Sequence, residues 1–209
     1  MCILYTILTY RINNLQMAIS NKGHVIWLMG LSGAGKTTLA IELGRKLKSK
    51  GLPSVILDGD QLRAGINKDL GFDDGSRSEN IRRTAEMAKM LSDNHIITIC
   101  SLITPKETDR LIIKNILGER LTTAFINCPI ELCETRDVKG LYKKARSGEI
   151  KKFTGIDSVF EVPVNADIII PTDRQTIQES VEILFENFCS LITKSSAIAR
   201  GHPTTLQHT

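Results

Sequence analysis

Apolar positions along the chain follow two alternating periods. Short apolar runs rich in β-branched residues fall at 24–29, 54–57, 96–102, 123–127 and 166–170. Apolar residues at helical spacing predict amphipathic helices over 36–50, 81–93, 106–117, 130–147 and 176–191. Strands that alternate with helices in this way predict an α/β fold of three layers, a parallel sheet with helices on both faces. Ligands of such sheets bind at the carboxyl ends of the strands.

The two ends of the chain lack this alternation. Residues 1–22 open on an apolar stretch, but Arg11 interrupts it well short of the roughly 20 residues that cross a bilayer, so we expect an extension and no membrane anchor. Met17 is a plausible second start. Residues 191–209 are polar without a helical period, which predicts a disordered tail. One domain is therefore expected over 23–190.

Composition narrows the class of protein. With 42% apolar residues in 209, the chain has enough apolar side chain for the core of one ordinary domain. A net charge of +4 and 5% aromatic residues do not point to nucleic acid, so no nucleic-acid partner is expected. Five scattered cysteines without a CxxC pair fit reduced thiols and a cytoplasmic location.

The segment between the first strand and the first helix matches the phosphate-binding pattern GxxxxGK[ST]. It consists of Gly30, Leu31, Ser32, Gly33, Ala34, Gly35, Lys36, Thr37 and Thr38. Glycines let backbone N–H groups surround phosphate oxygens, Lys36 can reach the β and γ phosphates, and the Thr37 hydroxyl can ligate Mg²⁺. The alternative is a glycine-rich turn that binds nothing. Because a strand precedes it and a helix follows, we expect MgATP.

Two acids follow the second strand, separated by one glycine. Asp58 and Asp60 can lie beside the phosphate loop, one near the metal and one near an acceptor hydroxyl, and Arg63 can pair with an anionic acceptor. The alternative is a polar loop capped by an aspartate. Following a phosphate loop within one βαβ unit, the functional interpretation is favoured.

Residues 71–83 combine an isolated aromatic residue with basic and amide side chains. Phe72 suggests a surface on which a base stacks, with Arg77 and Asn80 as contacts to an anion and a base edge. On this segment alone the simpler alternative is preferred, in which Phe72 packs on the following helix and Ser78 caps it.

The net positive charge of the chain is concentrated in the segment 136–157. Residues 136–152 hold seven basic and two acidic side chains, a net charge of +5, more than that of the whole chain. Such a run is usually a solvated helix face. In a phosphoryl-transfer domain it would instead be a lid that closes over two anionic ligands and excludes water.

Five segments in this order resemble one family. They are GLSGAGKTT, LDGDQLR, GFDDGSRSENIRR, DVKGLYKKARSGEI and FTGID, within residues 23–188. The set resembles the adenylylsulfate kinases, P-loop kinases that use MgATP to phosphorylate the ribose 3′-hydroxyl of adenosine 5′-phosphosulfate (APS), giving PAPS and ADP in sulfate assimilation. The resemblance implies a P-loop fold with a helical lid.

The resemblance also implies roles for individual residues. Asp58 would be the base for the 3′-hydroxyl, Lys36 would contact the transferring phosphoryl group, and Thr37 and Asp60 would hold magnesium. The implied substrate contacts are Asp60, Arg63, Phe72, Arg77, Asn80, Ile103, Thr104, Lys139, Leu141 and Phe153. Phe72 and Phe153 would sandwich the adenine of APS, and Lys139 with Leu141 would close the lid.

Two positions depart from the family pattern. Thr104 stands where many members have a serine described in some as a phosphorylated intermediate, and Glu107 stands where arginine is common. In-line transfer needs no covalent residue, so Thr104 is expected to belong to the substrate loop only. Glu107 leaves open a different nucleotide-linked acceptor, and a non-catalytic nucleotide sensor is a further alternative. Many family members have a longer segment before the first strand that is involved in dimer contacts, and residues 1–22 do not match it. A homodimer is therefore expected from the rest of the resemblance alone.

Overall fold

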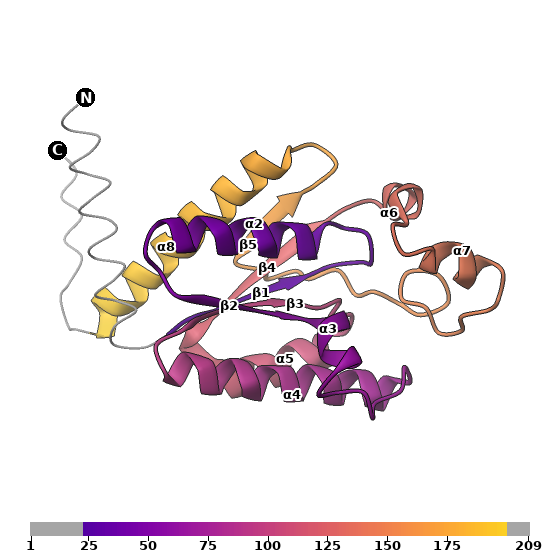
Figure 1. Ribbon diagram of the computed structural model, residues 1–209, viewed down its shortest axis with the longest axis horizontal. Helices are drawn as coiled ribbons and strands as arrows, with labels where there is room; N and C mark the ends of the chain where they lie inside the picture. The colour runs from indigo at the N-terminus through magenta and orange to yellow at the C-terminus, as the bar shows by residue number, and fades with distance from the viewer. Residues whose placement is uncertain (1–22, 200–209) are drawn as a thin grey trace.

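A five-stranded parallel sheet runs through the centre of the computed structural model, which describes residues 23–199 (Figure 1). The strands are β1 (Val25–Met29), β2 (Ser54–Asp58), β3 (Ile97–Ser101), β4 (Leu121–Asn127) and β5 (Ile168–Pro171). Their order in the sheet is β2-β3-β1-β4-β5, and every pair is parallel. The predicted strands are thus confirmed, and β1 lies at the centre of the sheet with its phosphate loop.

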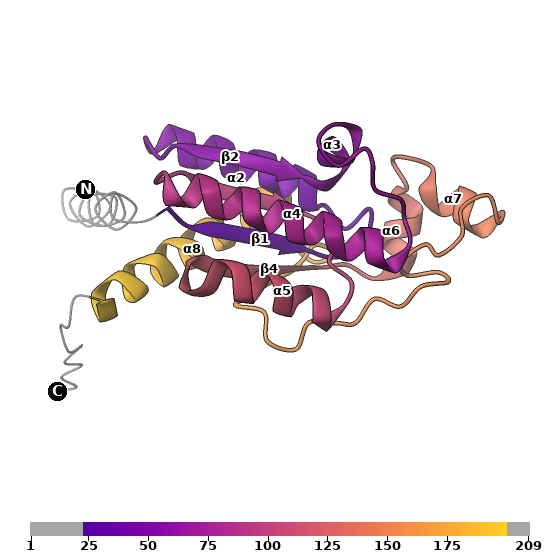
Figure 2. The ribbon, with the colours of Figure 1, turned by 90° about the horizontal axis from the view of Figure 1, so that it is seen from below.

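Helices cover both faces of the sheet, which confirms the three-layer α/β fold (Figures 1 and 2). One face carries α2 (Lys36–Ser49) and α8 (Ile177–Ala199), and the other carries α4 (Asp74–Asp93) and α5 (Glu107–Leu117). Three short helices lie near the carboxyl ends of the strands: α3 (Gly59–Ala64), α6 (Ile130–Arg136) and α7 (Leu141–Arg146). A 3-10 turn, η1 (Gly118–Arg120), leads into β4.

The central strand is buried on both faces because its side chains alternate between two cores. Ile26 and Leu28 belong to the cluster under α2 and α8, whereas Val25, Trp27 and Met29 belong to the cluster under α4 and α5. All five are at most 1% exposed. This explains why the first strand reads as an unbroken apolar run instead of an alternating one.

Two predicted helix boundaries were wrong near the ligand side of the sheet. Helix α4 begins at Asp74 instead of residue 81, because the Asp73 carboxylate accepts hydrogen bonds from the backbone N–H and the hydroxyl of Ser76 and caps the helix earlier. The helix predicted over 130–147 is broken into α6 and α7. Gly140 has a φ of +64° at this break, and the Asp137 carboxylate accepts from two N–H groups of α7.

The last helix is longer than predicted. It continues to Ala199 instead of ending at residue 191. Ile192 is 1% exposed and extends the apolar face by a turn, and no glycine or proline occurs before Gly201. The predictions for 1–22 and for 200–209 lie outside the described residues. Within 23–199, no helix is long and apolar enough to cross a membrane.

Candidate active site

The carboxyl ends of the strands open into one cavity of about 1040 Å³. It collects residues that lie far apart in the sequence, from the phosphate loop, the ends of β2 and β3, the start of α4 and the lid. Among the predicted site residues, its lining includes Ser32, Gly33, Ala34, Gly35, Lys36, Thr37, Thr38, Asp58, Asp60, Arg63, Phe72, Arg77, Asn80, Ile103, Thr104, Lys139, Leu141 and Phe153. The fold therefore brings together nearly all of the predicted residues.

Two predicted residues, Gly30 and Leu31, lie outside the cavity lining and help to fix the shape of the phosphate loop. A Cβ on Gly30 would lie 2.5 Å from the carbonyl oxygen of Ile126, so only glycine fits there. The Leu31 carbonyl accepts a hydrogen bond of 2.7 Å from the Lys36 ammonium. Gly33 and Gly35 take φ values of +75° and +102°, which turn the loop into the start of α2.

Lys36 is held in a desolvated position at the base of the cavity. Its side chain is 8% exposed, and burial lowers its pKa to about 8, an effect that the nearby Asp60 and Asp58 carboxylates partly offset. An incoming phosphate chain would supply the negative charge that this buried ammonium lacks.

Asp58 connects the phosphate loop to the second strand. Its Oδ2 accepts a hydrogen bond of 2.8 Å from the Thr37 hydroxyl, which also lies 3.4 Å from the Ser101 hydroxyl. Its Oδ1 accepts from the backbone N–H groups of Asp60 and Gln61, at 3.0 and 3.4 Å, and so caps α3. The carboxylate is 6% exposed and fixed from two sides.

Asp60 has a different environment from Asp58. Its side chain is 67% exposed and forms an ion pair with Lys139, which joins the end of β2 to the lid across the cavity. The structure thus pairs Thr37 with Asp58 and places Asp60 against the lid, a distribution that the spacing of two aspartates could not reveal.

The side chains around Thr37 suit magnesium. Hydroxyl and carboxylate oxygens are the hard ligands that Mg²⁺ prefers, and it usually takes one or two carboxylates together with substrate phosphates. Because Thr37 donates its proton to Asp58, its oxygen keeps lone pairs for a cation. Within 23–199, no three His, Cys, Asp or Glu side chains form a group that could hold a metal ion.

The two predicted adenine-stacking residues line the same cavity but are held differently. Phe72 is 66% exposed and carries the Arg63 guanidinium 4.7 Å above its ring. Phe153 is 8% exposed and meets Tyr142 edge to face at 5.0 Å. Because Phe72 is exposed and Asp73 caps the helix, the alternative of an apolar staple capped by Ser78 was wrong.

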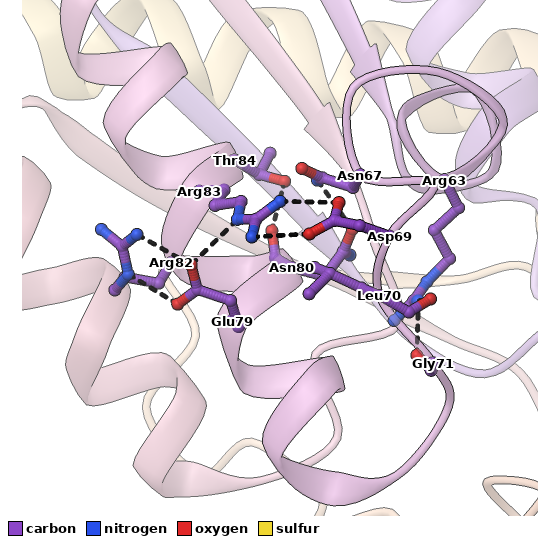
Figure 3. Close-up of polar contacts among 10 residues, drawn as sticks. All are labelled: Arg63, Asn67, Asp69, Leu70, Gly71, Glu79, Asn80, Arg82, Arg83 and Thr84. Carbon is purple, nitrogen blue, oxygen red and sulfur yellow. Dashed lines mark hydrogen bonds and ion pairs between the residues drawn. The ribbon is translucent and has the colours of Figure 1, made fainter.

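Arg63 and Asn80 are oriented by the loop between α3 and α4 (Figure 3). The Arg63 guanidinium donates to the carbonyls of Gly71, at 2.7 Å, and Leu70, at 3.4 Å. The Asn80 amide oxygen accepts from the Asn67 side chain at 2.9 Å, and both asparagines are buried. A loop that contributes no side chain to the buried apolar core is therefore attached to the cavity wall by polar contacts.

Arg77 was predicted to contact an anion; it lines the cavity, and its guanidinium also donates to three groups of the protein. Its Nε donates to the Phe72 carbonyl at 2.8 Å, and its two terminal nitrogens donate to the Thr154 hydroxyl and the Lys152 carbonyl. It therefore connects the start of α4 to the lid loop that carries Phe153.

Glu107 does not face the acceptor pocket. Its carboxylate pairs with Arg110 at 3.0 Å and is not part of the cavity lining. The neighbouring Lys106 pairs with Asp74 at 2.8 Å, also outside the lining. The Glu107 carboxylate is thus paired within its own helix and lies outside the cavity, which weakens the argument for a different acceptor.

The sequence analysis missed the wall on the other side of the phosphate loop. That wall includes Arg136, Thr172, Gln175, Thr176, Ile177 and Ser180. Arg136 donates to the Thr172 carbonyl at 2.8 Å, and the Thr172 hydroxyl donates to the Ala34 carbonyl at 3.0 Å. The sequence did contain a signal for this wall, because residues 172–176 follow the carboxyl end of β5, and ligands of parallel sheets bind at the carboxyl ends of the strands.

Comparisons with known proteins agree with this geometry. A family model described as adenylylsulphate kinase matches residues 22–171. Adenylyl-sulfate kinases of Clostridium kluyveri and Clostridium acetobutylicum are 46% and 47% identical, over 80% and 83% of this chain and 84% and 86% of theirs. The APS kinase of Mycobacterium tuberculosis in complex with AMPPNP and APS is 38% identical and covers 79% of this chain and 97% of its own, with a TM-score of 0.77. The chain therefore belongs to the adenylylsulfate kinase family.

Proposed function

We propose that this chain carries out the reaction of its family, phosphorylation of APS to PAPS, by one direct transfer of the γ-phosphoryl group of ATP to the 3′-hydroxyl. The observation that supports this mechanism is that one cavity is lined both by the phosphate loop and by the residues expected to bind APS. Its volume of about 1040 Å³ reaches the upper end of the ~300–1,000 Å³ typical of a small-molecule site, as two nucleotides require.

Residues 30–38 hold the phosphates of ATP. Their backbone N–H groups and the start of α2 favour anions, and Lys36 neutralises charge on the transferring group. The related M. tuberculosis enzyme holds an ATP analogue and APS together, which supports the presence of both nucleotides at once.

Thr37 and Asp60 hold magnesium in this proposal. The ion, when bound with ATP, supplies positive charge to the phosphate oxygens. Asp58 keeps the Thr37 hydroxyl proton turned away from the cation, and Asp60 lies at the cavity rim, near enough to Lys36 to raise its pKa.

Asp58 is the base in this proposal. An ionised carboxylate has about four acceptor positions, and three of those on Asp58 are used by Thr37, Asp60 and Gln61. The remaining lone pair lies on Oδ2, in a buried carboxylate that lines the cavity. It takes the proton of the 3′-hydroxyl as the phosphoryl group arrives.

The acceptor side binds APS through stacking and charge. Phe72 and Phe153 contact its adenine, Arg63, Arg77 and Asn80 contact its phosphosulfate and nucleoside, and Ile103 with Thr104 completes the wall. Lys139 and Leu141, on the lid 136–157, close the cavity and exclude water.

The test of the activity is ADP release, measured by a coupled assay with MgATP alone and with MgATP and APS. The expected result is release that depends on APS and yields a 3′-phosphorylated product. Folded protein that releases no more ADP with APS than without it would contradict the proposal.

Paired variants separate the two acids. Asp58→Asn should lower kcat by ~10²–10⁴, as for loss of a general base, and should change the Mg²⁺ dependence of ATP binding less than Asp60→Asn does, because the amide oxygen can still accept from the Thr37 hydroxyl. Asp60→Asn should instead raise the Mg²⁺ concentration that half-saturates ATP binding. The opposite pattern would exchange the two roles.

Two further parts of the proposal concern the whole protein. Cys100, Cys128, Cys133 and Cys189 are free thiols, which supports a reducing, cytoplasmic location.

A homodimer stays a prediction, which sedimentation equilibrium of the full chain would test.

A further inference from the structure

The loop after β3 contains a strained residue in the wall of the cavity. Thr104 has a φ of +50°, in the left-handed region that β-branched residues rarely adopt, and it is 1% exposed. Ile103, Thr104 and Pro105 all line the cavity. A conformation of this kind persists only where surrounding contacts enforce it, and it occurs preferentially at functional sites.

A buried hydrogen bond from the centre of the sheet supports this conformation. The Trp27 indole N–H, on β1, donates to the Thr104 hydroxyl at 2.8 Å, and the Trp27 side chain is fully buried. An indole N–H has a donor and no acceptor, so a buried one needs a partner such as this oxygen.

Backbone contacts hold the residues on either side. The Ile103 carbonyl accepts from the Gly30 N–H at 3.2 Å, and the Pro105 carbonyl accepts from the Glu161 N–H at 2.9 Å. The Arg110 guanidinium, 9% exposed, lies 3.4 and 3.3 Å from the carbonyl oxygens of Thr104 and Pro105. The backbone of residues 103–105 is thus held by three parts of the chain: the phosphate loop, α5 and the segment around Glu161 that follows the lid.

The hydrogen bond of Thr104 is unsuited to covalent catalysis. A hydroxyl that is to be phosphorylated must lose its proton to a base, and the indole N–H can only donate. The oxygen that would attack is instead the acceptor of a bond that points into the core. The same bond is well suited to fixing the position of the residue.

We propose that Thr104 is a positioning residue, and that the Trp27–Thr104 hydrogen bond sets the shape of residues 103–105 against the acceptor nucleotide. The inference rests on the proposed function. The loop leads into α5, which packs on α4, and Ser78 of α4 donates to Asp109 of α5 at 2.6 Å. Since α4 carries Arg77 and Asn80, we assign the loop to the APS side of the cavity, next to the start of the phosphate loop at Gly30.

The principal variant is Thr104→Val, which keeps the shape of the side chain and removes the hydroxyl. The matched control is Thr98→Val, because Thr98 lies on β3, which leads into this loop, is fully buried, and its hydroxyl has no hydrogen-bond partner. Steady-state kinetics should show the KM for APS raised about 3- to 10-fold in Thr104→Val, the loss expected for one neutral hydrogen bond. The KM for ATP and the turnover rate should stay close to those of wild type, and the Thr98 control should match wild type throughout.

Two more variants keep the test decisive if Thr104→Val does not fold. Thr104→Ser retains the hydroxyl and should bring the KM for APS back close to that of wild type. Trp27→Phe removes the donor but keeps a buried ring, and should raise the KM for APS as Thr104→Val does. In the double variant the two effects should not add, since both remove the same bond.

Three outcomes would overturn the inference. If Thr104→Val slowed turnover about a thousandfold or more at an unchanged KM, the hydroxyl would have a role in the chemistry. A lower melting temperature with an unchanged KM for APS would make the bond purely structural, and multiplicative effects of the two variants would uncouple Trp27 from Thr104. Failure of wild type to release ADP with APS would instead overturn the proposed function, which keeps the two failures distinct.

Discussion

Lys36 shows how one buried charge can make nucleotide binding depend on pH. Burial lowers its pKa to about 8, whereas the phosphates of ATP favour the charged form and raise it on binding. Below pH 8 the ammonium is already protonated in the free protein. Above pH 8 it is increasingly neutral, so binding must take up a proton and becomes weaker as the pH rises.

The expected result is an ATP dissociation constant that is nearly flat from pH 7 to 8 and rises by up to about tenfold per pH unit above 8, until the pKa of the complex is reached. The phosphate groups of ATP have pKa values near 6, so they stay ionised above pH 8 and do not contribute to this dependence. Isothermal titration calorimetry in two buffers of different ionisation enthalpy measures the proton uptake. Lys36→Met is the control and should lose the dependence; a pH-independent affinity in wild type would contradict the account.

The loop between α3 and α4, residues 65–73, contributes no side chain to the buried apolar core and is held by ion pairs. Its Asp69 carboxylate receives two hydrogen bonds of 2.9 Å from Arg83 of α4, and Arg83 also donates to Glu79 at 2.9 Å (Figure 3). Glu79 receives two more from Arg82, and these arginines lower its pKa to about 2. A planar guanidinium that binds a carboxylate with two parallel bonds fixes orientation as well as distance.

We therefore expect Arg83→Met to loosen the loop and raise the KM for APS a few-fold, because the loop carries Phe72 and the carbonyls that orient Arg63. Trypsin should cleave the ligand-free variant faster after the exposed Lys68. Arg82→Met is the matched control, since Arg82 pairs with Glu79 and Glu86 on its own helix and not with the loop. Equal effects of the two variants would refute a role specific to the loop.

At the scale of the whole molecule, polar side chains connect the lid to the body of the domain, and two of these contacts reach the segment after β2 and helix α4. Lys139 pairs with Asp60 at the end of β2, and Arg77 of α4 donates to Lys152 and Thr154. The lid is thus joined both to the segment after β2 and to α4, and it carries the excess positive charge of the chain. Closing such a segment excludes water from the transfer.

Arg77→Met should speed amide hydrogen exchange of residues 150–157 in the ligand-free protein and also raise the KM for APS. Direct contact with APS alone would raise the KM and leave the ligand-free exchange unchanged, so the exchange rate decides between the two roles. Lys144→Met is the control, because Lys144 lies on the lid but outside the cavity lining. Its exchange profile should match wild type.

The sequence by itself determined the layers, the phosphate loop and the side of the sheet that binds ligands. These features depend on local spacing: a strand must bury an apolar run, a helix must present one face, and GxxxxGK[ST] must turn its N–H groups inward. Lys36, Thr37 and Asp58 were predicted in this way, because each lies within a few residues of the end of a strand.

Only the tertiary structure decided which of these residues meet. Asp60 contacts Lys139 across 79 positions, Arg77 contacts Thr154 across 77, and Trp27 contacts Thr104 across 77. Such pairings depend on strand order, helix packing and the break between α6 and α7, where one glycine redirects the lid. Side-chain type and spacing carry no information about a partner so distant, since the geometry that joins them exists only after the sheet and its helices have packed.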